Sequence, residues 1–564
     1  MDDQFKNNSD QTVKPTPSTN SPTDGMVTPD QPAVSTPGQS PEQPAVINSP
    51  GGQPKSNKNL LKILLIVIVL AAAGAGAYFL LNKVNQPEKA ATVQSTKKTV
   101  SLLRVGVSQP FPSSFYPKSE ASIFPGEVNA QIFEGLTKYQ NENQIVPNLA
   151  ASWTNPDNTT WDFKLKPGIK FHDGNSVTPQ AVKSSIEALA STDYGEAYGA
   201  TIQTVTAKDA STVEIKTKTP DPLLPNELAN LWIYDTTSGK QNDPTNGTGP
   251  YTIKPNTSLT ADSLDLVSVN NYHGGQPMVK EIDFKLYSDD KTITQDVQQG
   301  KLDIADLSSQ SAVNDVKQYG YSSYVDKNPQ VFFIIPNTLK ATSPLSKLAV
   351  RQAIYEALDP TAIMKADGRT GSPATQFVPQ EIPGYSPDVQ RPKLDPTKAK
   401  SDLAAAGYAK GFSLTFTYFS THQAVAAEVQ KELAAIGVTL NLDSETNGPA
   451  LQKKALGGQT DLFYFAFSSS LIDSSDVIQP LLVGSANYKN GDLDKLYQQA
   501  STTLNNQDRL KLLEQANKLA MDDVAGFPLF VPDGIFFAVK SNLVIHTDNL
   551  TNYLGVDFWK VYGQ

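Results

Sequence analysis

The hydrophobic pattern of residues 132–189 predicts two strands and a helix that pack together. Residues 161–165 alternate apolar with charged side chains, which is the period-two pattern of a strand with one buried face. Pro167-Gly168 predicts a turn, and residues 169–171 resume the alternation, which predicts a returning strand. This stretch therefore begins as a strand hairpin.

A helix is predicted directly after this hairpin. The sequence His172-Asp173-Gly174 is typical of a second turn, with glycine at a position that favours positive φ. Thr178 followed by Pro179 is typical of a helix N-cap and first turn. The buried face of the helix is an apolar stripe of Val182, Ile186 and Leu189.

The remainder of the chain from residue 100 onward predicts strands and helices in alternation. A strand, a helix and a strand follow one another over residues 412–442, an order that indicates a parallel crossover in an α/β lobe. Residues 527–530 are predicted to return the chain to the first lobe. The other predicted strands are 100–107, 211–218, 282–287 and 331–338, and the other predicted helices are 350–359, 395–407, 490–494 onward and 508–520.

The N-terminal region has a different composition. Residues 1–59 are rich in Pro, Gln, Ser, Thr, Asn and Gly and nearly lack aromatic residues, so they are predicted to be disordered. Residues 60–81 are apolar apart from Lys62 and are long enough to cross a bilayer, which predicts one transmembrane helix. The alternative is a cleaved signal peptide, because Ala73, Ala75 and Ala77 offer the spacing of a cleavage site, although a leader of this length argues against it. Residues 82–99 are predicted to be a polar linker.

Several motifs together resemble one protein family. These are Glu134-Gly135-Leu136, residues 147–153, 161–165 and 170–174, and Gly247-Thr-Gly-Pro-Tyr251. In this order they are similar to the signature of the solute-binding proteins of peptide-type ABC transporters, solute-binding protein family 5. The resemblance covers residues 100–564, and continues through Val350–Asp359, Ala399–Tyr408 and Val429–Val438.

This resemblance implies the fold, the location and the partners. It implies an α/β, two-lobed fold of the periplasmic-binding-protein type II, in the large peptide-binder subclass with an extra subdomain. The protein would be a monomer that closes on an oligopeptide and presents it to ABC permease subunits with cytoplasmic ATPases. Residues 1–59 would then lie in the cytoplasm and the binding domain outside the cell membrane. The implied division is 100–147, 233–330 and 511–564 for lobe I, 148–232 for its extra subdomain and 331–510 for lobe II.

The same resemblance suggests residues that line the cleft. Phe111, Phe115 and Tyr116 follow the first predicted strand, which ends at the cleft in the family; they could instead pack their loop onto its own lobe. Gly249 and Tyr251 belong to a segment that lies near the hinge and cleft in relatives, and a purely structural turn is the alternative for this segment.

The stretch 461–476 carries the prediction for the ligand. In peptide-binding relatives a similar segment supplies an acid that holds the α-amino group of the peptide. In that alignment Phe467 takes the place of a Trp, Ser470 takes the place of the acid and Asp473 that of a second acid. Either Asp473 or Asp476 therefore serves as the amino anchor, or the ligand is held mainly by backbone and apolar contacts. Phe467 also continues a strand pattern with Phe463 and Phe465, which favours a role in the core.

Composition narrows the remaining functions. The formal net charge of −10, without a long basic stripe, argues against nucleic acid as a partner. The chain has no Cys and only four His, which lack metal-ligand spacing, so we expect no cofactor, no metal site and no enzymatic activity. Alternative functions are the binding of an oligosaccharide, a metal chelate or another small solute, and solute sensing by a receptor that signals across the membrane.

Overall fold

The computed structural model describes the C-terminal part of the chain. The described residues are 97–108, 111, 123–140, 144–190, 192, 195, 198–236, 246–255, 257, 260, 262–307, 310–326, 330–545 and 556–564. The predicted tail, the predicted transmembrane helix at 60–81 and most of the predicted linker lie outside them. Within these residues, no helix is both long enough and apolar enough to cross a bilayer. Gln94–Gln564 forms one compact unit.

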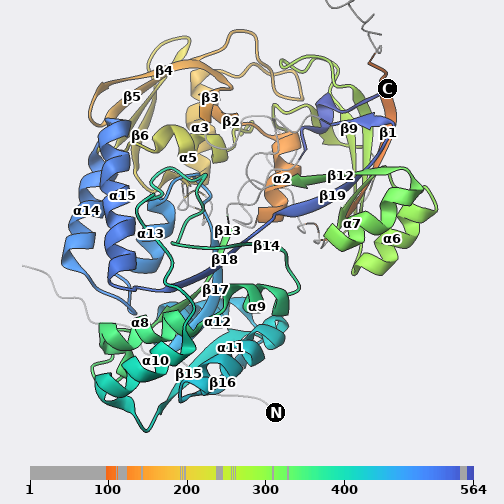
Figure 1. The fold of residues 1–564 in the computed structure, drawn as a ribbon. Coiled ribbons are helices and arrows are strands. Elements are labelled where there is room, and N and C mark those ends of the chain that lie inside the picture. The colour runs from red at the N-terminus through yellow and green to blue at the C-terminus, as the bar shows by residue number, and fades with distance from the viewer. Residues whose placement is uncertain are drawn as a thin grey trace, which may run out of the picture. The chain divides into compact units, whose positions relative to one another are not determined.

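A mixed sheet forms the centre of the first lobe, and we call it the first sheet. Its strand order is β12-β19-β11-β1-β10-β9-β8 (Figure 1). Helices α6 (Asp290–Gln298) and α7 (Gln310–Val316) pack on one face, and α2 (Ile123–Ile132) packs on the other. The strands are β1 (Val100–Val107), β8 (Tyr251–Ile253), β9 (Ser263–Ser268), β10 (Val279–Leu286), β11 (Ile304–Leu307), β12 (Tyr321–Asp326) and β19 (Ile535–Lys540).

The small subdomain contains an antiparallel sheet in the order β4-β5-β7-β6. These strands are β4 (Ala150–Asp157), β5 (Thr160–Leu165), β6 (Ile202–Ala207) and β7 (Thr212–Thr217), and α3 (Pro179–Leu189) packs against β6 and β7. The hairpin β2 (Thr137–Gln140) and β3 (Gln144–Pro147) lies beside α5 (Leu224–Asn230). The apolar residues of the four-stranded sheet and of α3 share one hydrophobic cluster with those of the first sheet, so this sheet and α3 belong to the first lobe.

One strand prediction in this subdomain was wrong. Residues 169–171 form no strand; Lys170 makes only an isolated bridge with Ser176, and β5 pairs with β4 and β7 instead. The alternation arises because Ile169 and Phe171 are both buried in the first-lobe core. The helix start was confirmed, since the Thr178 side chain accepts a hydrogen bond from the backbone N–H of Ala181 at 3.1 Å.

The second lobe is built on a second sheet in the order β14-β18-β13-β17-β15-β16. Its strands are β13 (Gln330–Pro336), β14 (Gly371–Pro373), β15 (Phe412–Phe419), β16 (Val438–Glu445), β17 (Leu462–Ser468) and β18 (Phe527–Pro532). The predicted crossover was confirmed, because β15 and β16 are parallel and α11 (Gln423–Ala435) joins them. The other helices of this lobe are α8 (Leu348–Ala357), α9 (Pro360–Ala366), α10 (Pro396–Leu403), α12 (Gly448–Leu456), α13 (Ser475–Leu482), α14 (Gly491–Thr502) and α15 (Asn506–Asp522).

The prediction that residues 527–530 return the chain to the first lobe was also wrong. These residues form β18, which pairs with β13 and β14 in the second sheet and is buried in the core of the second lobe. The return takes place one strand later, at β19. The apolar run is long because both faces of β18 are covered. Such a run predicts a buried strand, but the hydrophobic pattern alone does not show to which lobe the strand belongs.

Candidate functional site

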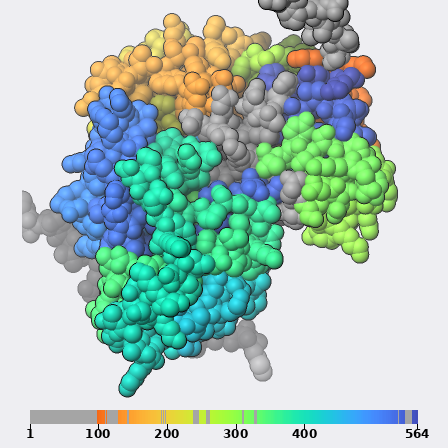
Figure 2. Space-filling view, in the orientation of Figure 1, coloured from red at the N-terminus to blue at the C-terminus, as the bar shows by residue number. Residues whose placement is uncertain are grey.

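The chain crosses between the two sheets twice. The strands at these crossings show which end of each sheet is nearer to the other sheet. The chain leaves the first sheet after Asp326 in β12, and re-enters it at Ile535 in β19. These two residues are paired with each other, so both passages lie at the same edge of the first sheet. In Figure 2, dark-blue atoms from the C-terminal part of the chain are visible between the green atoms of the first lobe and the teal atoms of the second. We call this edge of each sheet the inter-lobe edge.

In the first sheet, the carboxyl ends of parallel strands lie at the inter-lobe edge. Leu307 at the end of β11 pairs with Phe536 at the beginning of antiparallel β19. Strand β1 is parallel to both β11 and β10, so these three strands end at the same edge. Ligands of open α/β sheets bind beyond the carboxyl ends of the parallel strands.

The second sheet has the matching arrangement. Gln330, the first residue of β13, pairs with Ser468, the last residue of β17. Strands β15 and β16 run parallel to β17, so they also end at the inter-lobe edge. The segment that follows β17, residues 469–476, comprises a loop and the first two residues of α13, and it begins at the inter-lobe edge; we call it the 469–476 loop.

Within the 469–476 loop, Asp473 is part of a buried ion pair. Its side chain is nearly inaccessible, with 1% of the residue exposed, and Arg509 of α15 is 5% exposed. Arg509 Nη1 and Nη2 donate to the two carboxylate oxygens at 3.0 and 2.6 Å. The backbone N–H and hydroxyl of Ser475 donate to the same carboxylate. Since the charge of Asp473 is already neutralised, this acid is unsuited to hold a ligand ammonium group.

Asp476, three residues later, has a different environment. Ser469 Oγ donates to one carboxylate oxygen at 2.7 Å, and Ser470 Oγ and the Leu471 N–H donate to the other at 3.1 and 2.8 Å. No Lys, Arg or His forms an ion pair with Asp476 in the part of the chain that the structure describes. Burial raises the pKa of Asp476 to about 7, and the carboxylate of Asp473 contributes to this rise. Asp476 thus has an organised carboxyl group to which no described residue supplies a cation.

The small subdomain contacts this loop through α5. Asn226 Nδ2 donates to the Leu471 carbonyl at 2.9 Å, and Asn230 Nδ2 donates to the Ser470 carbonyl at 3.2 Å. Burial raises the pKa of Tyr139 and of Tyr198, and the nearby Asp476 carboxylate adds to both shifts. Phenol groups of the first lobe therefore lie close to a carboxylate of the second lobe.

Backbone strain occurs in the same loop. Ile472 has a φ of 53°, in the left-handed region that a β-branched residue rarely adopts, and its side chain is 2% exposed. Such strain costs about 1–3 kcal/mol and persists only where the surroundings fix the backbone. Here the buried Ile472 side chain and the hydrogen bonds to the neighbouring carbonyls supply those constraints.

The other residues of the 461–476 prediction have mixed roles. Phe467 is partly buried, pairs with Val331 and contacts Phe465 at 6.5 Å between ring centroids, which fits the predicted core role. Ser470 is exposed and hydrogen-bonds to Asp476. Ser470 therefore orients the acid instead of occupying the place of one.

The residues predicted from the first lobe are mainly structural where they are described. Phe111 is 4% exposed and packs edge-on against Phe284, an arrangement that favours packing over a cleft-lining role. Tyr251 is fully buried and donates to the Val279 carbonyl at 3.1 Å. A Cβ at Gly249 would lie 2.5 Å from the Gln131 carbonyl oxygen, so close backbone packing requires this glycine. Phe115 and Tyr116 lie outside the described residues.

A further polar group at the second sheet was not predicted. His422 lies three residues after the end of β15, and its Nδ1 is 2.6 Å from the Asp367 carboxylate. Arg369 pairs with the other oxygen of Asp367 at 2.9 Å and lies over the ring of Phe332. The guanidinium is partly exposed, so this group places a cation near the carboxyl end of β15. Its members are scattered in sequence, and no motif links them.

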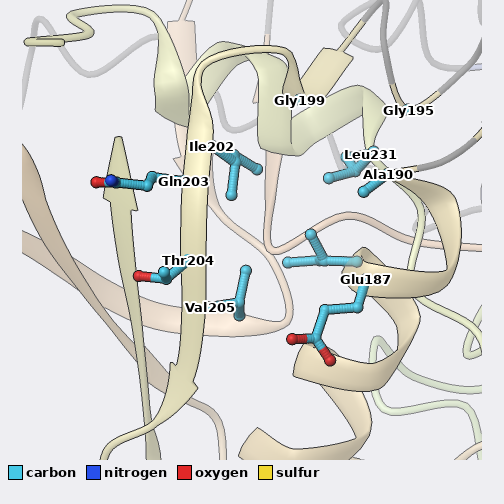
Figure 3. A pocket seen from close by; sticks show the side chains of 10 residues that line it. Glu187, Ala190, Gly195, Gly199, Ile202, Gln203, Thr204, Val205 and Leu231 are labelled. Atoms are coloured by element: carbon cyan, nitrogen blue, oxygen red, sulfur yellow. The ribbon is translucent and has the colours of Figure 1, made fainter. Parts of the chain in front are cut away.

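A small cavity lies within the small subdomain, between α3 and β6 (Figure 3). Its volume is about 100 Å³, and Ile186, Ile202, Val205 and Leu231 contribute apolar side chains to its lining. Pockets for small-molecule ligands have volumes of roughly 300–1,000 Å³, so this cavity is too small for a peptide. Among the described residues, no group of three or more His, Asp or Glu is arranged to hold a metal ion.

Comparison with known proteins identifies the family. Residues 144–489, more than half of the chain, match the family model "Bacterial extracellular solute-binding proteins, family 5 Middle". The probable D,D-dipeptide-binding periplasmic protein DdpA of Escherichia coli K12 is 26% identical over 433 residues, which cover 71% of this chain and 82% of DdpA.

Solved structures share the fold. The ABC transporter substrate-binding protein CtaP of Listeria monocytogenes matches with a TM-score of 0.72 and 21% identity, covering 83% of this chain and all of that one. The oligopeptide-binding protein AppA of Bacillus subtilis, solved with a nonapeptide, matches with a TM-score of 0.67 and 20% identity. This match also covers 83% of this chain and all of AppA. The two-lobed α/β architecture predicted from the sequence is thus confirmed. The chain belongs to the bacterial extracellular solute-binding proteins of family 5.

Proposed function

We propose that this protein is the membrane-tethered, extracytoplasmic receptor of an ABC importer, which binds oligopeptides between its lobes and delivers them to the permease. The observation that carries the proposal is the carboxylate of Asp476. It lies at the inter-lobe edge, accepts three hydrogen bonds and has no cationic partner among the described residues.

The α-amino group of a peptide fits this site chemically. An ammonium group can donate three hydrogen bonds, and a charge-assisted bond contributes about 1.5–3 kcal/mol. Closure of the lobes around the ligand excludes water and strengthens such a contact. Asp473 cannot take this role without losing its pairing with Arg509.

The rest of the peptide would be bound mainly through its backbone. An extended peptide can add to exposed strand edges, a mode that fixes the main chain and tolerates many side chains. The names of similar proteins support this ligand class, since one relative is described as a probable dipeptide binder and one structural neighbour was solved with a nonapeptide.

Tethering would be provided by the apolar segment 60–81. Its length matches the hydrocarbon thickness of a bilayer, and the polar residues 82–99 would separate it from the binding domain. In this arrangement the domain stays close to a permease in the same membrane without a separate lipid anchor, for which the chain has no cysteine.

The function is tested by identifying the natural ligand. The full-length chain is purified gently from cells, and native mass spectrometry with fragmentation is applied to whatever is bound. We expect a set of short peptides, whose masses give the range of lengths. A bound oligosaccharide or metal chelate would overturn the proposed ligand. An empty protein whose melting temperature is unchanged by peptide mixtures would overturn peptide binding altogether.

A further inference from the structure

A second carboxylate lies at the inter-lobe edge of the first sheet. Asp306 is the penultimate residue of β11, and it pairs with Phe537 of β19, the strand that arrives from the second lobe. Ser108, the residue directly after β1, donates from Oγ to Asp306 Oδ2 at 2.5 Å. Both residues therefore lie at the carboxyl ends of parallel strands, at the inter-lobe edge of the first sheet.

The surroundings of Asp306 differ from those of Asp303 in the same part of the chain. Asp303 is neutralised by Arg104 at 2.9 Å and by Lys540 at 3.4 Å. Asp306 has no ion pair with any residue that the structure describes, although its side chain is only partly exposed. Burial raises the pKa of Asp306, the hydrogen bond from Ser108 opposes this rise and the nearby Asp290 carboxylate adds to it.

A partly buried carboxylate without a cation is costly to the folded protein. Desolvation of a charge is offset only when an opposite charge or several hydrogen bonds replace the lost water. For Asp303 the protein supplies those cations from β1 and β19. No described residue supplies a cation to Asp306, and a molecule held between the lobes can supply one.

We propose that Asp306 binds a basic side chain of the ligand, so that this protein selects cationic oligopeptides. The inference rests on the proposed function and deepens it. Asp476 in the second lobe receives the α-amino group, and Asp306 in the first lobe receives a lysine or arginine group further along the peptide. The net charge of −10 also favours the encounter with a cationic ligand.

A cationic ligand also gives closure a direct electrostatic role. Each lobe contributes one carboxylate, so a peptide with two positive charges makes a charge-assisted contact with both lobes at once. Such contacts are realised together only when the lobes close around the peptide, and they therefore favour the closed arrangement. A peptide with one positive charge satisfies only one of the two acids.

The test is a comparison of matched peptides. Tetrapeptides with a free amino terminus are synthesised in pairs that differ only by lysine against glutamine, at each of positions two to four in turn. Isothermal titration calorimetry with the full-length protein measures both affinities. We expect the lysine peptide to bind about tenfold or more tightly than its glutamine partner at one position, which corresponds to about 1.4 kcal/mol.

Asp306→Asn identifies the residue responsible. This variant keeps an acceptor for the Ser108 hydroxyl, and we expect it to lose the lysine preference while binding the glutamine peptide as before. Asp262→Asn is the control, because it removes an exposed negative charge from the same lobe and should retain the preference.

The outcomes separate the two proposals. Binding of neither peptide by the wild-type protein would contradict the proposed function. Equal affinity for both peptides at every position, a preference that persists in Asp306→Asn, or loss of both peptides in that variant would each overturn the role of Asp306.

Discussion

Asp473 and Asp476 carry chemically identical groups in opposite environments, although only three positions separate them. The carboxylate of Asp473 is bound by both nitrogens of the Arg509 fork and by Ser475. Among the described residues, Asp476 is bound by the hydroxyls of Ser469 and Ser470 and by one backbone N–H. One acid is therefore paired with a cation inside the fold, and the other has no cationic partner in the part of the chain that the structure describes.

This difference shows how one loop can combine rigidity with binding. The ion pair of Asp473 joins the loop to α15 in the interior of the second lobe. Asp476 can then be held at a fixed position although its own environment lacks a cation. An anchor for a ligand needs this support, because a misplaced carboxylate loses the benefit of the contact.

The largest effect on stability is expected from removing the cation of the buried Asp473–Arg509 pair. Arg509→Ala removes the cationic partner of Asp473, which is 1% exposed in the wild-type protein. We expect the free energy of unfolding to fall by about 3–5 kcal/mol, measured by urea denaturation monitored at two wavelengths. Lys518→Ala removes a cation from an exposed pair on the same helix and should change stability by less than about 1 kcal/mol. Equal effects of the two variants would show that Asp473 has no structural role.

The environment of Asp476 also predicts how the stability of the protein depends on pH. The pKa of Asp476 is raised to about 7 in the folded protein, from an ordinary value of 3.8. Between these values the folded state binds a proton that the unfolded state has released, so this group makes stability fall as pH rises from about 4 to 7. Asp476→Asn removes this contribution because the amide does not titrate.

Without ligand, the stability of Asp476→Asn relative to the wild type should therefore increase by roughly 2–4 kcal/mol between pH 4 and pH 8. Melting temperatures across this pH range provide the measurement. The exposed Asp492→Asn serves as control and should shift stability little at either pH. A parallel pH dependence in wild type and Asp476→Asn would refute the assigned environment of Asp476.

Much of the fold could be predicted from the sequence because local signals agreed with the final structure. Thr178 caps its helix as expected. Strand β1 has the predicted bounds. In these places hydrophobic periodicity and capping chemistry lead to the same answer.

The errors and omissions arose where long-range packing decides. The alternation of residues 169–171 reflects burial without strand pairing, and β18 was assigned to the wrong sheet because both of its faces are covered. For the ligand anchor, the sequence left Asp473 and Asp476 as alternatives. Only the position of Arg509, 36 residues from Asp473, distinguishes them. Asp306 carried no motif, and it is notable only once β1, β11 and β19 are paired.

A smaller effect is expected where the small subdomain contacts the loop. Asn226→Ala removes the hydrogen bond to the Leu471 carbonyl. A hydrogen bond between neutral groups typically contributes about 0.5–1.5 kcal/mol. We expect peptide affinity to fall about two- to tenfold, measured by calorimetry. Gln180→Ala, which removes an exposed amide on α3 that bonds Ser184, should leave affinity unchanged. Equal affinities of the Asn226→Ala variant and the wild type would mean that this contact does not position the loop.

The central claim is that Asp476, and not Asp473, holds the amino terminus of a peptide. Calorimetry should compare one peptide with a free and with an acetylated amino terminus, on the wild type and on Asp476→Asn. We predict that acetylation weakens binding to the wild type about tenfold or more, and that it changes binding to Asp476→Asn little. A full acetylation effect in Asp476→Asn, or none in the wild type, would contradict the account.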